Sequence, residues 1–335
     1  MESILLLAHT EPDGTLAKPA LEALTAALAL GGELTVGLVG IAAQPAADRI
    51  AGAGAVRILA VTGEAFTQAR YATDAAAAEA LCRAANAAMV LAPATSRWAR
   101  ALPGVAYRLG GRVDTHATGL AMQNGAPAVT RWFYRQRMEA VLTRQQRPWV
   151  VLLDAGCVPA WSGAAGQATV EPVAVEAPAA RTTVTGIQAP KADEQTIRPD
   201  APLLFVAGAG WTKKQADGAV HSAEAETLIL GFLRTANASL GGSKSLVDLS
   251  GEGEAVLRFM THLNQIGQTG STPRHPKGLS TCCHGEEPHV VGWRFVNQRR
   301  AINLDANCCW ARGKADVLYV ADAFAVMREV NRLLG

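Results

Sequence analysis

The strongest constraint on the fold is the alternation, over the first 155 residues, of short apolar runs with alanine-rich helical patterns. Apolar runs typical of buried strands lie at residues 4–8, 34–39, 56–61 and 89–92. The segments between them, 18–30, 70–86 and 96–109, repeat apolar residues at helical spacing. This strand–helix order predicts a parallel sheet covered by helices.

The pattern changes after residue 112. Residues 113–154 contain β-type runs at 129–134 and 149–153, which predict a more antiparallel extension of the sheet. Residues 156–200 are rich in Pro, Ala, Thr and Val, so we expect a connecting excursion with one strand at 169–175 and a linker near 193–202. We therefore predict an N-terminal α/β domain over residues 1–195.

Residues 196–335 predict a second α/β domain of the doubly wound type. It would open with a strand at 202–207 and a glycine turn, followed by a helix at 222–240. Residues 251–265 have a helical pattern that suits either the core or a partner-facing insertion. A strand at 317–322 and a helix at 323–334 would close the chain.

Composition excludes several classes of protein. Of the 335 residues, 49% are hydrophobic and 18% are charged, which is enough apolar material for two cores. The formal net charge of +2 argues for neither nucleic acid nor an anionic membrane as partner. No apolar run reaches the ~20 residues of a membrane span, and we see no signal peptide. We expect a cytoplasmic protein whose six cysteines are reduced or bound to a group.

Several glycine-containing segments suit a ligand with phosphate groups. Gly267-Gln268-Thr269-Gly270 combines two glycines, which let backbone N–H groups approach phosphate, with two hydrogen-bonding side chains. Asn303 ends an apolar run and suits a polar ligand at the carboxyl edge of a parallel sheet. Taken singly, each segment is also an ordinary turn. The same holds for Gly208-Ala209-Gly210, and Gly241-Gly242-Ser243-Lys244 alone indicates a helix C-cap with a solvated lysine.

The order of these pieces resembles the alpha subunits of electron transfer flavoproteins. That family carries, in order, a Gly-Arg-Gly turn, a Gly-x-Ser-Arg-x-x-Val-Asp segment, Gly-Gln-Thr-Gly, Gly-Ile-Ser-Gly-Ala-Ile-Gln-His, Ile-Asn-Lys-Asp and a closing strand that ends in Asp. The matching pieces here are residues 208–210, 242–248, 267–270, 282–289, 302–305 and Asp322. The resemblance extends to the first domain through its N-terminal strand, the acidic-glycine turn at 11–14 and its α/β alternation.

The resemblance implies that the second domain binds FAD and that the chain forms a heterodimer with a beta subunit. Such a pair carries electrons from a flavin dehydrogenase to a quinone oxidoreductase or another respiratory acceptor, and is a carrier rather than a substrate-turning enzyme. By position, the resemblance assigns the following residues to the FAD site: Ser243, Lys244, Gln268, Thr269, Gly270, Gly285, His289, Asn303 and Asp322.

The chain departs from the family at two arginines. Ala209 stands where the family has the arginine of its Gly-Arg-Gly turn, and Lys244 stands where it has the arginine of its Ser-Arg pair. Lysine offers a point charge where arginine offers a planar fork, so the second change is not neutral. The segment Arg274, His275 and Lys277 is a basic group that suits either the FAD pyrophosphate or a solvated loop.

The largest departure is the segment 282–289, where the family has small apolar residues. Cys282 and Cys283 lie here, and Cys308 and Cys309 follow the next strand. Four converging thiolates suit zinc or an iron–sulfur cluster, although neither pair has C-x-x-C spacing. Redox-active thiols and small buried cysteines are the other interpretations. The alternatives to a flavin carrier are therefore the same fold with an iron–sulfur centre, or a scaffold subunit without flavin.

Overall fold

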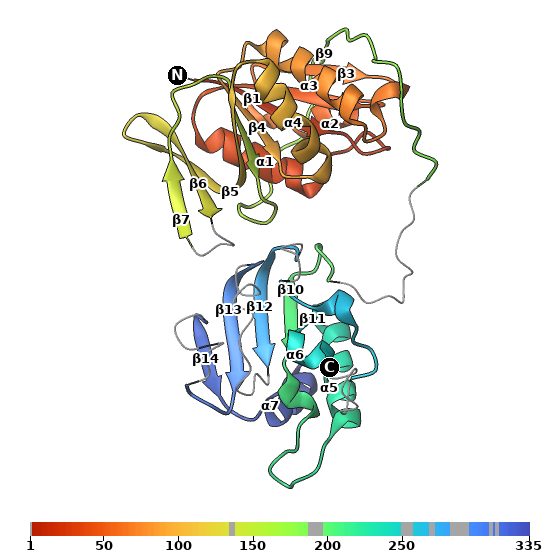
Figure 1. The fold of residues 1–335 in the computed structure, drawn as a ribbon, viewed down its shortest axis with the longest axis vertical. Helices are drawn as coiled ribbons and strands as arrows, with labels where there is room; N and C mark the ends of the chain where they lie inside the picture. The colour runs from red at the N-terminus through yellow and green to blue at the C-terminus, as the bar shows by residue number, and fades with distance from the viewer. Residues whose placement is uncertain are drawn as a thin grey trace. The chain divides into compact units, whose positions relative to one another are not determined.

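The computed structural model describes residues 2–133, 138–186, 197–248, 257–267, 272–281, 295–307, 311 and 315–335. The chain divides into two compact units, Met1–Ile187 and Gln188–Gly335, and each is described by itself (Figure 1). Both units are α/β, which confirms the predicted fold class.

The N-terminal unit is built on a nine-stranded sheet in the described part of the chain, in the order β7-β6-β5-β8-β4-β1-β2-β3-β9. Its strands are β1 (Ser3–His9), β2 (Glu33–Gly40), β3 (Arg57–Thr62), β4 (Met89–Pro93), β5 (Arg112–Gln123), β6 (Ala126–Phe133), β7 (Met138–Leu142), β8 (Trp149–Leu153) and β9 (Glu171–Pro172). Its longer helices are α1 (Lys18–Ala29), α2 (Gln44–Arg49), α3 (Tyr71–Ala85) and α4 (Ser96–Arg108). The strands and helices expected in the first 110 residues are confirmed.

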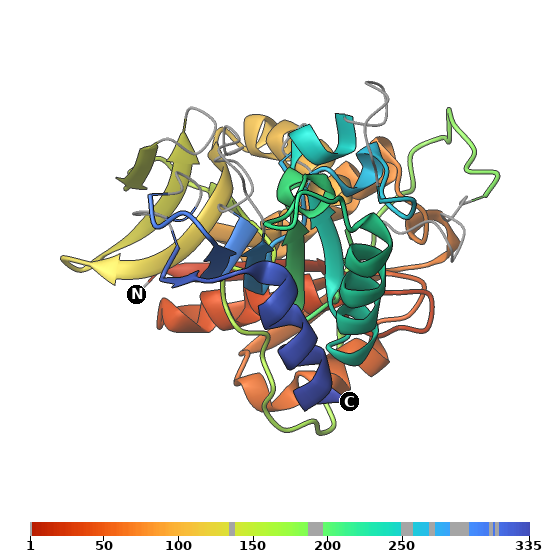
Figure 2. The same cartoon turned by 90° about the horizontal axis from the view of Figure 1, so that it is seen from below.

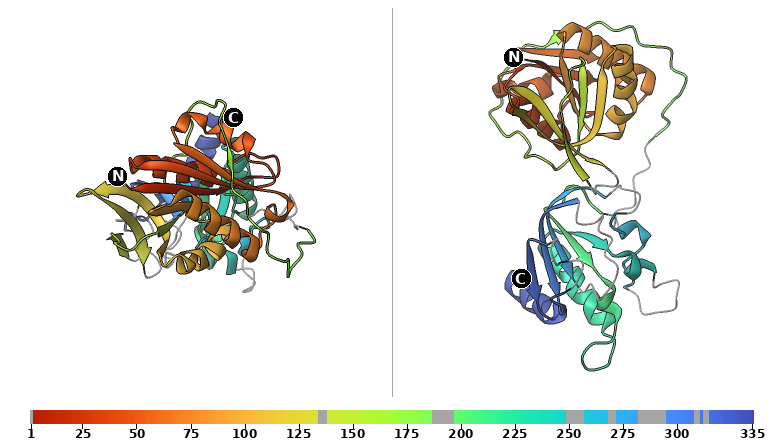
Figure 3. Two further views of the ribbon diagram at one scale, coloured as in Figure 1. Left: turned by 90° about the horizontal axis from the view of Figure 1, so that it is seen from above. Right: turned by 60° about the vertical axis from the view of Figure 1, so that its left-hand side comes forward.

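Helices cover both faces of this sheet (Figure 3). The apolar residues of α1 and α2 pack in one buried cluster with alternate residues of the central strands. The remaining residues of those strands pack with α3 and α4 in a second cluster. Strands buried on both faces explain why β1 and β4 are continuous apolar runs rather than alternating ones.

The antiparallel extension is confirmed for β5, β6 and β7, but not for residues 149–153. These residues form β8, which pairs in parallel with both β4 and β5. All five residues of β8 are buried, because it is an interior strand of the parallel part. The strand expected at 169–175 is only Glu171–Pro172, paired with β3.

One buried carboxylate joins the extension to the rest of the sheet. Asp114 on β5 is 2% exposed and accepts hydrogen bonds from Arg131 (3.2 Å), Arg144 (2.9 Å) and the indole Nε1 of Trp149 (2.9 Å). Burial alone would raise the pKa of Asp114, but the hydrogen bonds from Arg144, Trp149 and Arg131 outweigh it and lower that pKa. The charged form therefore stabilises the folded state.

The C-terminal unit contains, among its described residues, a five-stranded parallel sheet in the order β11-β10-β12-β13-β14. Its strands are β10 (Leu203–Ala207), β11 (Ser239–Gly242), β12 (His275–Thr281), β13 (Val296–Asn303) and β14 (Val317–Val320). Its helices are α5 (Ser222–Thr235), α6 (Lys244–Asp248) and α7 (Ala323–Leu334), with short 3-10 helices η3 (Ala209–Thr212) and η5 (His262–Asn264). Helices α5 and α7 lie side by side on one face of the sheet (Figure 2).

Two predicted helices of this unit are wrong in part. The helix expected over 222–240 ends at Thr235, because Asn237 takes a left-handed conformation (φ 47°) and the chain turns into β11. In the segment 251–265, the described residues 257–265 form turns and η5 rather than a helix, and residues 251–256 lie outside the described part. Leu257 is buried in the core, as one of the two interpretations expected.

We predict that Asp114→Ala lowers the free energy of unfolding by about 3–5 kcal/mol, because it leaves two arginines without their carboxylate. Urea unfolding followed by circular dichroism measures this change. The pKa of Asp114 is lowered in the folded state, so its contribution is present above the unfolded pKa of about 3.9 and is lost as pH falls through the folded pKa. The difference between the native chain and Asp114→Asn should therefore shrink in acid.

The control is Glu33→Ala, whose side chain is exposed at the start of β2. A loss in Asp114→Ala no larger than in this control would contradict the role given to Asp114.

Candidate functional site

The carboxyl edge of the second sheet holds the predicted site residues that the structure describes, namely Ser243, Lys244, Asn303 and Asp322. All five strands are parallel, so their carboxyl ends meet at this edge. The chain leaves β10 towards β11 on one side and later returns to β12 on the other, so the strand order reverses between β10 and β12. Ligands of open α/β sheets bind at such a reversal point.

Backbone hydrogen bonds hold three strand ends together there. The N–H of Ser243, after β11, donates to the carbonyl of Ala207 at the end of β10 (2.9 Å). The N–H of Gly208 donates to the carbonyl of Thr281 at the end of β12 (2.8 Å). The predicted residue Ser243 therefore lies next to the reversal point.

Ser243 and Lys244 form the start of α6. The Ser243 side chain is 2% exposed, and its hydroxyl accepts a hydrogen bond from the N–H of Leu246 (3.2 Å), as a helix cap does. The Lys244 side chain is about half exposed (53%), and its ammonium pairs with the Asp248 carboxylate. The helix cap and the ion pair therefore place the Lys244 ammonium at this edge of the sheet.

The glycine segment expected to be a helix C-cap is part of β11 instead. A Cβ on Gly242 would lie 2.2 Å from Cε of Met260, and one on Gly241 would lie 2.5 Å from Cγ2 of Ile266. At Gly241 the branched Ile266 side chain leaves no room for a Cβ, so glycine is favoured there. At Gly242 the near atom is the end of the flexible Met260 side chain, which can move aside. The N–H of Ile266 donates to the Gly242 carbonyl (3.1 Å), so Gly267 begins beside the end of β11.

Gly267 is the only residue of the Gly-Gln-Thr-Gly motif among those described. Its φ of 74° suits glycine, and its N–H donates to Oγ1 of Thr272 (2.7 Å), which closes the loop. The other predicted residues of this part lie outside the described residues: Gln268, Thr269, Gly270, Gly285 and His289. The four paired cysteines, Cys282, Cys283, Cys308 and Cys309, also lie outside them.

Asn303 and Asp322 lie on adjacent strand ends. Asn303 ends β13 and is 4% exposed, and its Oδ1 accepts from the N–H of Asp305 (2.9 Å). Its carbonyl accepts from the N–H of Ala321 (3.1 Å), directly before Asp322. The Asp322 carboxylate caps α7 by accepting from the N–H of Ala325 (2.7 Å). From β11 to β14 the edge spans four strand intervals, or about 19 Å, which suits an elongated ligand.

Two residues that sequence reasoning missed complete the reversal point. Trp211 is fully buried, and its Nε1 donates to Oγ1 of Thr281 (2.8 Å), which in turn donates to the Val206 carbonyl (3.1 Å). The Trp211 ring also packs on Phe324 of α7, with 4.6 Å between centroids. The sequence feature that could have indicated Trp211 is its position directly after the turn Gly208-Ala209-Gly210.

The Gly208-Ala209-Gly210 turn is not an open phosphate loop. Residues 208–212 are all buried, and Ala209 is 1% exposed within the core that α5 and α7 share with the sheet. The basic group of the sequence analysis lies at the opposite edge. His275 begins β12, is fully buried, and contacts the carbonyls of Pro273 (2.9 Å) and Arg198 (2.7 Å). This group therefore lies away from the carboxyl edge, and its position favours the interpretation as a loop over contact with the FAD pyrophosphate.

The first sheet also has a reversal point, between β1 and β4. His9 ends β1, and its ring stacks on the indole of Trp98 of α4, with 3.8 Å between centroids. Burial lowers the pKa of His9 to about 2, and the charge of Arg97 acts in the same direction. The imidazole is therefore neutral at physiological pH and cannot act as a general acid there.

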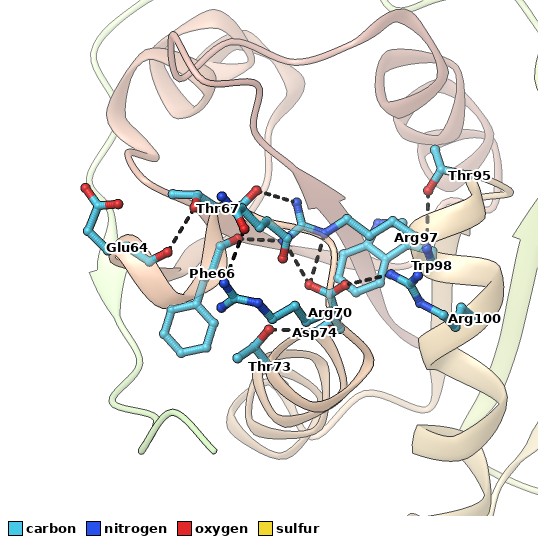
Figure 4. A network of polar contacts seen from close by, with 11 residues as sticks. Glu64, Phe66, Thr67, Arg70, Thr73, Asp74, Thr95, Arg97, Trp98 and Arg100 are labelled. Carbon is cyan, nitrogen blue, oxygen red and sulfur yellow. Dashed lines mark hydrogen bonds and ion pairs between the residues drawn. The ribbon is translucent and has the colours of Figure 1, made fainter. Parts of the chain in front are cut away.

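Arg97, which precedes Trp98 in α4, lies at the centre of a network of polar contacts (Figure 4). Its guanidinium donates to the carbonyls of Phe66 (2.6 Å) and Thr67 (3.0 Å) and to the buried carboxylate of Asp74 (2.8 Å). Burial raises the pKa of Asp74, although Arg97 and Arg100 act in the opposite direction. The chain's own side chains thus occupy this edge, whereas the second sheet presents polar residues at several strand ends.

Comparison with known proteins agrees with the fold of the first unit. A protein-family model described as "Electron transfer flavoprotein domain" matches residues 4–180, just over half of the chain. A search of curated proteins finds no match. Among the helices of the described residues, none has the length and apolarity that a membrane span needs.

We predict that Trp211→Phe lowers the free energy of unfolding of the C-terminal unit by about 1–2 kcal/mol, because an aromatic contact with Phe324 is kept while the hydrogen bond to Thr281 and part of the indole packing are lost. Trp211→Ala, which also leaves a cavity, should lower it by about 3–5 kcal/mol. Thermal unfolding of both variants measures the difference. Equal losses in the two would show that packing is not what Trp211 contributes.

We predict that Asp74→Leu destabilises the N-terminal unit by about 3 kcal/mol, because Arg97 then remains buried without this hydrogen-bond acceptor and countercharge. The double variant Asp74→Leu/Arg97→Leu should recover part of that loss, since it buries no charge. Urea unfolding gives both values. A double variant that is less stable than Asp74→Leu would contradict this account of the pair.

Proposed function

Because this chain belongs to the electron transfer flavoprotein domain family, we propose that it is the alpha subunit of a heterodimeric electron carrier and that its C-terminal unit binds FAD. The family match covers the N-terminal unit, so the FAD site rests on other observations. The main one is that three residues of the family's motifs lie at the carboxyl ends of parallel strands of one sheet: Ser243 follows β11, Asn303 ends β13 and Asp322 follows β14.

The residues present fit an elongated flavin dinucleotide. The edge offers a fixed cation, Lys244, for the electron-rich part of the ring or a phosphate, and buried polar side chains at Ser243 and Asn303. Gln268, Thr269, Gly270, Gly285 and His289 join them by the resemblance stated above. The fit is weaker at residues 208–210, where a buried alanine replaces the family's arginine.

Bound FAD supplies reversible one- and two-electron chemistry, and the protein's task is to hold and orient it and to set its electrostatic surroundings. The Asp248 carboxylate holds Lys244 in place and partly balances its charge. Trp211 and residues 208–212 are buried at the end of β10, next to this edge. In the proposed pathway a flavin dehydrogenase donates electrons, and a quinone oxidoreductase or similar acceptor receives them.

The test is the absorption spectrum of the chain co-expressed with its beta subunit, with acid-released flavin and iron measured on the same sample. We expect one FAD for each chain and no iron. Iron with sulfide would favour a cluster at the paired cysteines instead, and a colourless complex would favour the scaffold.

We predict that Asn303→Ala raises the dissociation constant for FAD about tenfold, equal to about 1.4 kcal/mol, because a buried hydrogen-bonding side chain is removed from the edge. Titration of the flavin-free complex with FAD, followed by flavin fluorescence, gives the constant.

The matched control is Asn297→Ala, which lies on the same strand near its amino end. Circular dichroism of both variants separates loss of binding from loss of folding. Equal dissociation constants for the two folded variants would remove Asn303 from the site.

A further inference from the structure

A hairpin, residues 213–221, projects from the C-terminal unit between β10 and α5 (Figure 1). Lys214 and Val220 pair in it as an antiparallel bridge around a turn at 215–218. The whole connection from β10 to α5, residues 208–221, is longer than the about two to six residues usual between a strand and the next helix. Long connections of this kind are usually functional when they are ordered.

Hydrogen bonds hold the hairpin in one conformation. The N–H of Gln215 donates to the carbonyl of Ala219 (2.8 Å), and the N–H of Gly218, whose φ is 80°, donates to the carbonyl of Gln215 (2.9 Å). The Gln215 side chain joins the hairpin to the buried turn before it, because its Nε2 donates to the carbonyl of Gly210 (3.1 Å). A ligand therefore does not have to order this backbone when it binds, which lowers the entropic cost of binding.

The base of the hairpin lies at the carboxyl edge of the second sheet. At one end it follows the turn 208–212, which begins with the hydrogen bond from Gly208 to Thr281 at the reversal point. At the other end the His221 ring lies edge-on to Phe324, with 6.3 Å between centroids. Phe324 is in the first turn of α7, which the Asp322 carboxylate caps. Both ends of the hairpin thus adjoin the candidate site.

The hairpin carries two cations that are available to an anion. Lys213 and Lys214 are exposed, and neither ammonium forms an ion pair within the ranges of the chain that the structure describes. The carboxylate of Asp217, the only acidic residue of the hairpin, accepts from the N–H of Ala219 (2.9 Å) and contacts Nε2 of His221 (2.7 Å). The carboxylate nearest in sequence is therefore already engaged, and the two lysines retain their charge.

The strand ends themselves carry little positive charge for a dinucleotide, whose pyrophosphate is a dianion. Of the described residues at this edge, Lys244 is partly balanced by Asp248, and Asp305 and Asp322 add further carboxylates. These carboxylates repel a phosphate group. Additional cations beside the edge are needed to offset that repulsion, and exposed lysines act as flexible point charges for phosphate.

We propose that the hairpin 213–221 is a phosphate-binding arm of the ligand site, in which Lys213 and Lys214 supply positive charge to the pyrophosphate of the dinucleotide. The proposal rests on the proposed function for the identity of the ligand, and it adds residues that lie outside the motifs and outside the family match. The position of the hairpin base at the carboxyl edge favours a phosphate over an acidic surface of a protein partner.

The test measures dissociation constants of the flavin-free complex with the beta subunit for FAD and for riboflavin, which has no phosphate. Lys213→Ala/Lys214→Ala should raise the constant for FAD at least tenfold and reduce its dependence on salt, because charged contacts are lost. The constant for riboflavin should stay within twofold. The control is Arg234→Ala, which removes an exposed cation from the last turn of α5, at the other end of that helix. Circular dichroism establishes that each variant is folded.

A constant for FAD in the double variant within twofold of that in Arg234→Ala would overturn the proposal. An equal loss for FAD and riboflavin would also overturn it, because the effect would then not depend on phosphate. Unchanged FAD binding with weaker association with the beta subunit would assign the lysines to a protein interface instead.

Failure of the unaltered complex to bind FAD would remove the proposed function, and ADP then tests the hairpin separately. Binding of ADP that the double variant weakens at least tenfold would leave the phosphate-binding arm standing for another pyrophosphate ligand. Absence of ADP binding in that case would overturn this proposal as well.

Discussion

The coincidence of strand ends in a parallel sheet is the constraint on which the candidate site depends. Residues that are far apart in sequence, such as Ser243, Thr281 and Asn303, share one edge because β11, β12 and β13 all end there. The bonds from Trp211 to Thr281 and from Gly208 to Thr281 fix the reversal point between β10 and β12. These hydrogen bonds join the ends of β10 and β12, between the strands that carry Ser243 and Asn303.

Both sheets have a reversal of strand order, but different residues lie at the two reversal points. At the first sheet's reversal point, Arg97 donates to backbone carbonyls and to Asp74, and His9 stacks on Trp98, so the chain's own groups fill the space. At the second, Ser243 and the half-exposed Lys244 follow β11, and Asn303 ends β13. The N-terminal unit carries the family match, and the C-terminal unit carries the motifs on which the proposed FAD site rests.

Much of the fold could be predicted from the sequence because strands buried on both faces leave uninterrupted apolar runs, as at β1 and β4. An apolar run does not show whether its strand pairs in parallel or antiparallel. For this reason β8, which is a buried parallel strand, was predicted to belong to the antiparallel extension. The end of α5 was missed because Asn237, rather than a glycine, makes the left-handed turn. Motif order selected Ser243, Asn303 and Asp322, which lie at this edge. It could not predict that Gly241 and Gly242 belong to a strand, because that depends on their pairing with Val206 and Ala207 of β10. The roles of Trp211 and Thr281 depend on a contact across 70 positions that no local pattern encodes.

The most direct test of the central claim is hydrogen exchange of the complex with and without FAD. The account predicts that FAD slows exchange at the carboxyl edge of the second sheet, in residues 207–212, 243–248 and 303–305. Residues 9–14 and 95–100, at the edge of the first sheet, should be unchanged. Protection confined to the first sheet would contradict the assignment of the ligand site to the C-terminal unit.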